Sequence, residues 1–474
     1  MDGEMDDKTE DKMDDKMDIY KKLVEIVGEE YVSVNPEELY IYSSDPGTME
    51  PCKPDYVVIP DSVEEIQKIV VLANRHKIPI VPMGGALSLS GLVRPLKGGI
   101  VLDMKRMNRI IEVNEKSRYA VIEAGVSEGE LKAYLNKHHP NLRHSMPDAP
   151  PIATITANAL IHGSGRLSQQ YGFHSDMING LEVVLPTGEI CRVGSCSISP
   201  YWFTRAPLPE LAGLFIGWFG ATGIVTKLGI KLYPRQKLRD VMIFVTENPD
   251  YVADVIWRIT QTEVTEDLTV WAQPRPEWAE GFQHTTVYLT ANSEEEMELK
   301  KKIVRNAVRE YITRKEGGFL MLTPAMKAMF LQEPMSQLVR FADVRKGGGF
   351  EYVGAILPVE LFGDAYRKGL EIAERIDITY AFNIRVIGRA HCMMFAYAYP
   401  FNRADEEDVE RARKALHETN KVVLEMGGIP WKAELPAQKL ILERMDSTTK
   451  ELMRKILQLL DPNNIMSPGN WEVE

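Results

Sequence analysis

The chain has 474 residues, of which 44% are apolar and 26% charged, so it is long enough to bury more than one core. Its formal net charge of −12 argues against a nucleic-acid binder, because neutralising phosphates requires clustered Lys and Arg that the sequence does not present. We therefore expect a small molecule or another protein as the partner.

The cysteines and the first residues indicate a cytoplasmic protein. Four cysteines, irregularly spaced, are too few for a disulfide framework or a four-thiolate metal site. Residues 1–18, rich in Asp, Lys and Met, lack the basic flank and apolar run of a targeting peptide, and we expect a disordered acidic tail. The uncharged run 211–225 is about fifteen residues long, short of the roughly twenty that span a bilayer, so no transmembrane segment is expected.

The first ordered region has the pattern of a compact α/β unit. Residues 54–60 (PDYVVIP) predict a strand, and Ser62 followed by Glu65 predicts the capped start of a helix. Two further strands are expected in IPIVPMGG and GGIVLDM. The loop 83–91 (MGGALSLSG) then lies directly after a strand, where ligands gather in α/β folds.

Small-residue loops recur further along the chain. MGGALSLSG offers consecutive backbone N–H groups that can hold a pyrophosphate, although such a loop is equally often a plain turn. A second run, ATITANALIHGSG (153–165), and a third, GWFGATGIV (217–225), also adjoin predicted strands of a second, α+β subdomain between 118 and 235. Three such loops predict one long ligand threaded between two subdomains.

These segments carry a family resemblance. VPMGGALSLSG, EAGV, ATITANA, YGFHSDMINGLEVVLPTGE, LFIGWFGATGIVTK and DPNNIMSPGNW resemble, in order and spacing, successive blocks of the vanillyl-alcohol oxidase and D-lactate dehydrogenase superfamily. The resemblance implies an α+β fold with a bipartite FAD-binding domain of the p-cresol methylhydroxylase (PCMH) type, made of two α/β subdomains, and an α+β cap domain. It implies domain ranges of 19–236 for FAD binding, 237–429 for the cap and 430–474 for a segment returning to the FAD domain.

The resemblance also implies which residues contact FAD. The first loop would cradle the pyrophosphate, the second would flank the flavin ring, and the third and the C-terminal turn would complete the site. The residues so implied are Pro82, Gly84, Gly85, Ala86, Leu87, Ser88, Leu89, Ser90, Gly91, Pro147, Asp148, Ala153, Thr154, Ile155, Thr156, Gly163, Ile224, Val225 and Asn470.

A catalytic constellation is expected in NIRVIGRAHCMMF (383–395). If this segment is one strand, alternation places Arg385, Arg389 and His391 on one face, where they could clamp a carboxylate and accept a proton. The alternative is that the histidine is an ordinary hydrogen-bonded residue and the arginines are merely solvated.

Two branches of the superfamily match different residues. In the D-lactate dehydrogenase branch, His391 matches the second His of a metal-binding block and Glu434 matches a later Glu, which would orient His391. Ile384 and Leu435 replace the other ligands, so no metal is predicted. In the vanillyl-alcohol oxidase branch, Pro-Tyr-Arg holds a phenolate, and here Lys432 could still stabilise negative charge.

The resulting hypothesis is an FAD-dependent dehydrogenase that converts a 2-hydroxy acid resembling D-lactate or glycolate into a 2-oxo acid. His391 would accept the proton, and Arg385 or Arg389 would hold the carboxylate. The alternatives are an aryl or alkyl alcohol oxidoreductase and a flavin-holding subunit of an electron-transfer complex. Without an NAD fingerprint or an iron–sulfur cysteine pattern, electrons would pass to an external acceptor: an electron-transfer flavoprotein, an iron–sulfur subunit, a cytochrome or a quinone. The chain could form homo- or hetero-oligomers.

Overall fold

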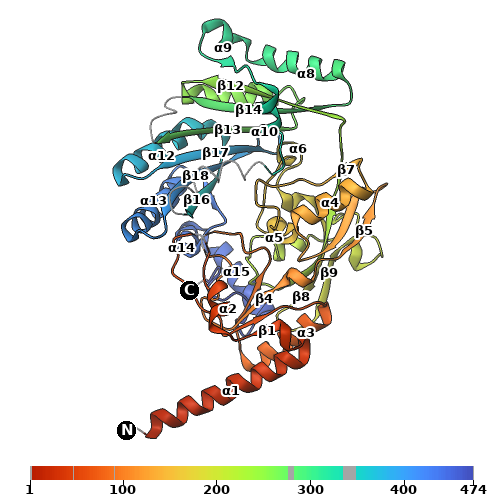
Figure 1. The fold of residues 1–474 in the computed structure, drawn as a ribbon, viewed down its shortest axis with the longest axis vertical. Coiled ribbons are helices and arrows are strands. Elements are labelled where there is room, and N and C mark those ends of the chain that lie inside the picture. Colours follow the sequence, from red (N-terminus) through yellow and green to blue (C-terminus); the bar gives the residue numbers. More distant parts are fainter. Residues whose placement is uncertain (1–2, 46, 90, 276–281, 335–347, 473–474) are drawn as a thin grey trace.

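The structure is a computed structural model that describes residues 3–45, 47–89, 91–275, 282–334 and 348–472. The chain folds into two lobes: the first half of the chain forms one, and most of the second half forms the other (Figure 1). The first lobe contains two subdomains with separate cores, and the second is built on one large sheet. The expected α+β organisation, with a bipartite domain and a cap, is confirmed.

The first subdomain is the predicted α/β unit. Its elements are β1 (Val32–Ser33), α2 (Pro36–Ile41), β2 (Tyr56–Val58), α3 (Val63–His76), β3 (Ile80–Met83) and β4 (Ile100–Asp103). The sheet order is β1-β2-β4-β3, and β2, β4 and β3 run parallel. The Ser62 hydroxyl accepts a hydrogen bond from the backbone N–H of Glu65, which confirms the predicted cap of α3. The loop after Met83 therefore begins at the carboxyl end of a parallel strand.

The second subdomain is an antiparallel sheet in the order β5-β6-β10-β8-β9. Its strands are β5 (Ile110–Asn114), β6 (Tyr119–Glu123), β8 (Ile178–Val184), β9 (Ile190–Gly194) and β10 (Ile224–Lys231), and its helices are α4 (Glu128–His138), α5 (Ile155–Leu160) and α6 (Ser168–Tyr171). A small two-stranded sheet of β7 (Leu142–Arg143) and β11 (Tyr233–Pro234) lies where the chain leaves this lobe.

The cap is an eight-stranded sheet in the order β15-β12-β14-β13-β17-β18-β16-β19. Its strands are β12 (Leu238–Thr246), β13 (Asp267–Arg275), β14 (Gln283–Ala291), β15 (Gly318–Phe319), β16 (Gly348–Leu357), β17 (Tyr380–Ile387), β18 (Cys392–Asn402) and β19 (Ile429–Trp431). Its helices are α7 (Val252–Thr260), α8 (Glu294–Ala307), α9 (Arg309–Arg314), α10 (Pro324–Phe330), α12 (Phe362–Ile376) and α13 (Glu406–Glu425).

The two faces of the cap sheet have different surroundings. Residues of α7, α8, α12 and α13 share one apolar core with alternate residues of the strands, among them Phe395 and Tyr397 of β18. The intervening residues Met394, Ala396 and Ala398 point to the opposite face because side chains alternate along a strand. That face forms part of the candidate site.

The C-terminal segment returns to the first lobe after α14 (Leu435–Arg444) and α15 (Ser447–Leu460). The backbone N–H of Ile80 in β3 donates to the Ile465 carbonyl at 2.7 Å, and the N–H of Ser467 donates to the Ile80 carbonyl at 2.8 Å. The indole of Trp471 donates to the Gly217 carbonyl at 2.8 Å. Residues 465–471 are thus hydrogen-bonded to the strand before the first small-residue loop and to the third loop.

Helix α1 (Gly3–Val27) corrects the expectation for the N-terminus, and it extends away from the body of the molecule (Figure 1). Residues 3–18 were expected to be disordered but are helical. Ile19, Leu23 and Val27, spaced four apart, pack into the first core and anchor the helix, and the Lys22–Asp18 ion pair at 2.5 Å has the spacing that stabilises a helix surface. No helix of the described residues is long and apolar enough to cross a membrane.

Candidate functional site

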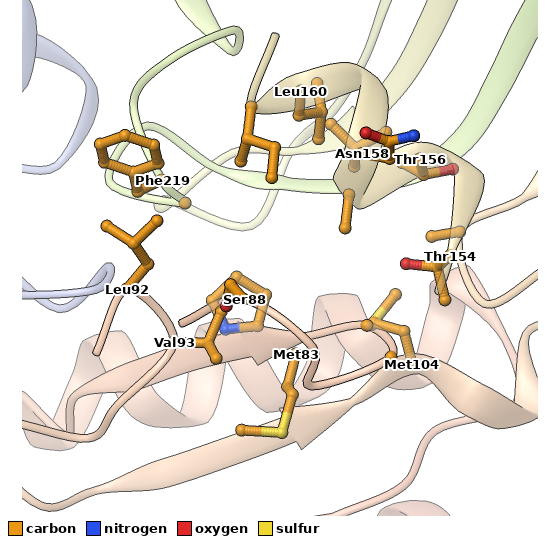
Figure 2. A pocket seen from close by; sticks show the side chains of 18 of the residues that line it. Met83, Ser88, Leu92, Val93, Met104, Thr154, Thr156, Asn158, Leu160 and Phe219 are labelled. Atoms are coloured by element: carbon orange, nitrogen blue, oxygen red, sulfur yellow. The ribbon is translucent and has the colours of Figure 1, made fainter. Parts of the chain in front are cut away.

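A cavity lies between the two subdomains of the first lobe, where the three small-residue loops meet (Figure 2). Ser88 and Val93 come from the side of the first loop, and Thr154, Thr156 and Asn158 face them from α5 and its approach. Phe219 of the third loop lies above Leu92 at another side of the cavity. The three loops therefore enclose one space, as a long ligand between two subdomains requires.

The first loop packs tightly against residues 152–157 at one wall of this cavity, and polar groups in the same wall lack partners among the described residues. A Cβ atom on Gly85 would lie 2.5 Å from the Ile152 carbonyl oxygen, and one on Gly84 would collide with Thr154 Oγ1, so both positions need glycine. The hydroxyls of Thr154 and Thr156 are buried without a hydrogen-bond partner in the described part of the chain. Buried polar groups are normally paired, so a bound ligand with polar atoms would satisfy them.

Most of the residues implied to bind FAD line this cavity. They are Pro82, Gly84, Gly85, Ala86, Leu87, Ser88, Ala153, Thr154, Thr156, Ile224 and Val225. Their contacts with FAD stay predictions, and Ser90 lies outside the described residues.

Seven of the implied residues that the structure describes do not line this cavity, and two of them, Pro147 and Asp148, line the second cavity described below. Ile155 packs in the core of the second subdomain, and Leu89 is also buried. The N–H of Gly91 donates to Asp45 Oδ2, the N–H of Gly163 donates to the Asn158 carbonyl, and the side chain of Asn470 accepts from Gln438. Their backbone or side-chain groups are therefore already engaged within the protein.

A second cavity adjoins the first and lies against the cap sheet. The two cavities share Leu87, Ala149, Asn158 and Lys432 in their walls. Most of the other wall residues come from neighbouring strands of the cap: Phe350 and Tyr352 of β16, Ala381, Phe382, Asn383, Ile384 and Arg385 of β17, Met394, Ala396 and Ala398 of β18, and Trp431 of β19. Pro147, Asp148 and Ser164 complete the wall from the first lobe. A substrate here would contact a cofactor held in the first cavity.

Lys432 lies at the junction of the two cavities. Its ammonium donates to the Tyr352 hydroxyl at 2.7 Å and lies 4.2 Å from the centre of the Trp431 ring. The indole of Trp431 donates to the Ile161 carbonyl at 2.7 Å, which fixes the ring. Tyr352 thus places a phenolic hydroxyl beside Lys432, which Trp431 cannot provide. This arrangement was not identified from the sequence.

Arg385 belongs to a buried charge cluster at the wall of the second cavity. Its guanidinium donates to Asp148 at 2.7 Å and to Asp267 at 3.0 Å. Burial alone would lower the pKa of Arg385, but the carboxylates of Asp267 and Asp148 raise it above its ordinary value. A second buried guanidinium, that of Arg166, lies 3.7 Å from Asp267. Arg385 is therefore already paired with carboxylates of the protein.

Arg389 and His391 do not converge with Arg385, so the predicted strand face is wrong. Strand β17 ends at Ile387, and residues 388–391 form a hairpin turn in which Arg389 and Ala390 have positive φ. His391 is exposed, and Arg389 pairs with Glu263 at 3.0 Å with 61% of its side chain exposed. Neither residue lines either cavity.

Glu434 is buried but is not positioned to orient the exposed His391. It precedes α14 and accepts a hydrogen bond from the Asn420 side chain. Burial raises the pKa of Glu434 to about 7, since a carboxylate without a cationic partner is costly to bury. Among the described residues, no three His, Cys, Asp or Glu side chains cluster as a metal site would require.

Comparisons with known proteins agree with this geometry. Residues 54–194 match the family model of the FAD binding domain, and residues 355–471 match that of the C-terminal domain of FAD linked oxidases. The glycolate oxidase subunit GlcD of Bacillus subtilis is 26% identical, covering 95% of this chain and 96% of its own. The 4-cresol dehydrogenase flavoprotein subunit of Pseudomonas putida is 22% identical, covering 96% and 95%.

Solved structures share the fold. A crystal structure of p-cresol methylhydroxylase with substrate bound superposes with a TM-score of 0.85 at 20% identity, covering 96% of each chain. A 4-ethylphenol oxidase from Gulosibacter chungangensis, in complex with isoeugenol, gives a TM-score of 0.80 at 20% identity, covering 96% of this chain and 97% of its own.

Proposed function

This chain belongs to the vanillyl-alcohol oxidase and D-lactate dehydrogenase superfamily of FAD-dependent oxidoreductases, and from that premise we propose that it oxidises an aryl alcohol to the aldehyde or ketone. The observation that carries this proposal is the second cavity, whose largely apolar walls contain an ammonium group paired with a phenol. This substrate class replaces the 2-hydroxy acid expected first from the sequence.

The walls of the second cavity suit an aromatic ring. Phe350, Tyr352 and Trp431 supply aromatic surface. The small side chains of Ala396 and Ala398 leave space for a ring against the cap sheet. Aromatic rings bind well against such surfaces because they bury a large apolar area. A small hydroxy acid such as lactate would leave most of this surface without a partner.

Lys432 and Tyr352 can hold an oxygen anion. The ammonium has further N–H groups beyond the one it donates to Tyr352, and the Tyr352 hydroxyl can donate onward. An anionic phenol oxygen held there would gain charge-assisted hydrogen bonds. We therefore expect a preference for substrates with a hydroxyl on the ring, such as 4-hydroxybenzyl alcohol.

Asp148 is the proton acceptor in this proposal. It is the one carboxylate among the described residues that line the second cavity, and Arg385 holds it by an ion pair of 2.7 Å. FAD, held by the small-residue loops, would accept the hydride from the alcohol carbon. Asp148 would accept the hydroxyl proton as the carbonyl bond forms.

A 2-hydroxy acid is the second candidate. The similarity to a glycolate oxidase subunit over 95% of the chain favours it, and Lys432 could hold a carboxylate as well as a phenolate. Against it, Arg385 is paired with two aspartates and Arg389 lies in a surface turn. These pairings weigh against Arg385 or Arg389 as the carboxylate clamp of the first hypothesis.

Electrons would leave the reduced flavin for an external acceptor. Both full-length relatives above are named as subunits, which supports a partner protein such as an iron–sulfur or cytochrome subunit. An electron-transfer flavoprotein or a quinone would meet the same chemical need. Reduction of each acceptor by the substrate-reduced protein would identify the class.

The test is a steady-state comparison of alcohols with an artificial one-electron acceptor. We expect kcat/KM for 4-hydroxybenzyl alcohol to exceed that for benzyl alcohol at least about tenfold, since a charge-assisted hydrogen bond contributes roughly 1.5–3 kcal/mol. D-lactate and glycolate should be turned over more slowly than either. Faster turnover of D-lactate than of both aromatic alcohols would refute the proposal.

A further inference from the structure

A cleft of about 700 Å³ lies where the chain passes from β11 to β12, and it shares no wall residue with the two cavities described above. Five cationic side chains line it: Lys132 of α4, Arg143 of β7, Arg235 and Lys237 of the link between the lobes, and Arg239 of β12. Glu333 is the one carboxylate among the described residues that line it. In a chain with a net charge of −12, this concentration of positive charge needs an explanation.

Two of the five cations are fixed by carboxylates. Arg143 pairs with Glu266 at 2.5 Å and with Glu333 at 3.2 Å, and Arg239 pairs with Glu333 at 2.7 Å. Only 7% of the Arg143 side chain is exposed. Arg166 holds the backbone of this region by donating to the carbonyls of Phe330 and Gln332. The cleft therefore has a rigid, buried frame.

The other three cations, Lys132, Arg235 and Lys237, are not balanced by ion pairs with carboxylates of the described residues. Lys132 donates to the Glu333 carbonyl at 2.6 Å. Burial lowers the pKa of Lys132, the Glu333 carboxylate opposes this shift, and the guanidinium groups of Arg239, Arg235 and Arg143 lower the pKa further. The nearby guanidinium groups thus repel the Lys132 charge, and an anion bound among these cations would relieve the repulsion.

The lining residues come from several chain segments, and this arrangement favours a small ligand. They come from separate segments that meet where the chain crosses from β11 to β12, so the cleft is concave and bounded by both lobes. A volume of this size falls within the range of small-molecule sites. An anion bound here would contact residues of the FAD-binding lobe and of the cap at the same time.

We propose that this cleft binds a small organic anion carrying two or more phosphate or carboxylate groups. The ligand would be held by Lys132, Arg235 and Lys237, with Arg143 and Arg239 as the fixed floor. Its chemistry is shared by phosphorylated compounds and polycarboxylates, which the test below distinguishes. The site is separate from both the FAD cavity and the substrate cavity, with no residue in common.

The experiment is calorimetric titration of the full chain, saturated with FAD, at low ionic strength. The probes are pyrophosphate and citrate, with acetate as the monovalent control. We expect saturable binding of at least one multivalent probe and none of acetate, with an affinity that falls as salt is added. Pyrophosphate alone would identify a phosphate ligand and citrate alone a polycarboxylate. Absence of saturable binding for both multivalent probes would overturn the proposal.

A double variant assigns the binding to the cleft. Arg235→Gln with Lys237→Gln removes two exposed cations without touching the buried frame, and we expect the dissociation constant to rise at least about tenfold. Arg454→Gln, an exposed arginine on α15, is the matched control and should bind the probe as the unmodified chain does. FAD content and melting temperature establish that each variant is folded. An unchanged dissociation constant in the folded double variant would refute the site.

Discussion

The FAD cavity and the substrate cavity adjoin, but they are built from different material. The FAD cavity is formed by loops whose small residues let one segment of backbone pack closely against another, as Gly84 and Gly85 do against residues 152–157. The substrate cavity is formed by side chains projecting from four neighbouring strands of the cap sheet. A backbone-lined cavity tolerates few changes in shape, whereas side chains on a sheet face can vary individually. Cofactor retention and substrate choice should therefore respond to separate substitutions.

Lys432→Met should have the largest effect on catalysis. Removing a donor to a developing or bound oxygen anion typically costs about a hundredfold in rate, and we expect that loss in the rate of flavin reduction by 4-hydroxybenzyl alcohol. Benzyl alcohol, which has no phenol oxygen, should be affected less. Lys439→Met, an exposed lysine seven residues later, is the control. Equal losses for both alcohols would contradict the phenolate role.

Ala396→Phe should close the substrate cavity and leave the FAD cavity intact. The added ring fills space over β18 that the substrate would occupy, and we expect kcat/KM to fall roughly thirtyfold, equivalent to about 2 kcal/mol of lost transition-state stabilisation. Bound FAD, measured by absorbance, should stay stoichiometric. Ala404→Phe places the same ring on an exposed residue after the same strand and should leave kcat/KM unchanged. Loss of FAD from the Ala396 variant would mean that the two cavities are not separable.

Gly85→Ala tests the FAD cavity, as Ala396→Phe tests the substrate cavity. The new Cβ would meet the backbone at Ile152, which must shift, and we expect FAD affinity to fall roughly tenfold. Gly318→Ala, where a Cβ meets nothing within 4 Å, is the matched control. Once the variant is saturated with FAD, its KM for the alcohol should be near that of the unmodified chain. FAD binding as tight as in the control would show that the packing of this loop against Ile152 does not shape the cofactor site.

His391→Ala should have the smallest effect. The side chain is exposed in the β17–β18 turn and lines neither cavity, so flavin reduction should change by less than about twofold. A slowing of about a hundredfold, the effect expected of a lost proton acceptor, would restore this histidine to the catalytic site.

The same contrast explains what the sequence could predict. Gly84, Gly85 and Thr154 lie in continuous loops whose small residues and flanking strands identify a ligand-binding turn locally. The pairing of Tyr352 with Lys432 depends on the register of β16 against β19, in which Gly354 lies opposite Trp431. No local pattern specifies which residue of a distant strand will lie beside Lys432.

The sequence held a sign that His391 does not lie on the same strand face as Arg385, but the apparent alternation of side chains hid it. Gly388 stands within the apparent strand, and a glycine inside a strand pattern often marks a break. In the structure Gly388, Arg389 and Ala390 all have positive φ, which a continuous strand does not allow. By contrast, CMMFAYAYP placed small or flexible residues at Met394, Ala396 and Ala398, a pattern that could have indicated the cavity face.

Anaerobic reduction of the bound flavin is the most direct test of whether the substrate is an aryl alcohol. Purified protein saturated with FAD is mixed with 4-hydroxybenzyl alcohol or with D-lactate, and the flavin absorbance is followed without any acceptor. We expect rapid bleaching by the aromatic alcohol and slow or no bleaching by D-lactate. Bleaching by D-lactate alone would contradict this expectation.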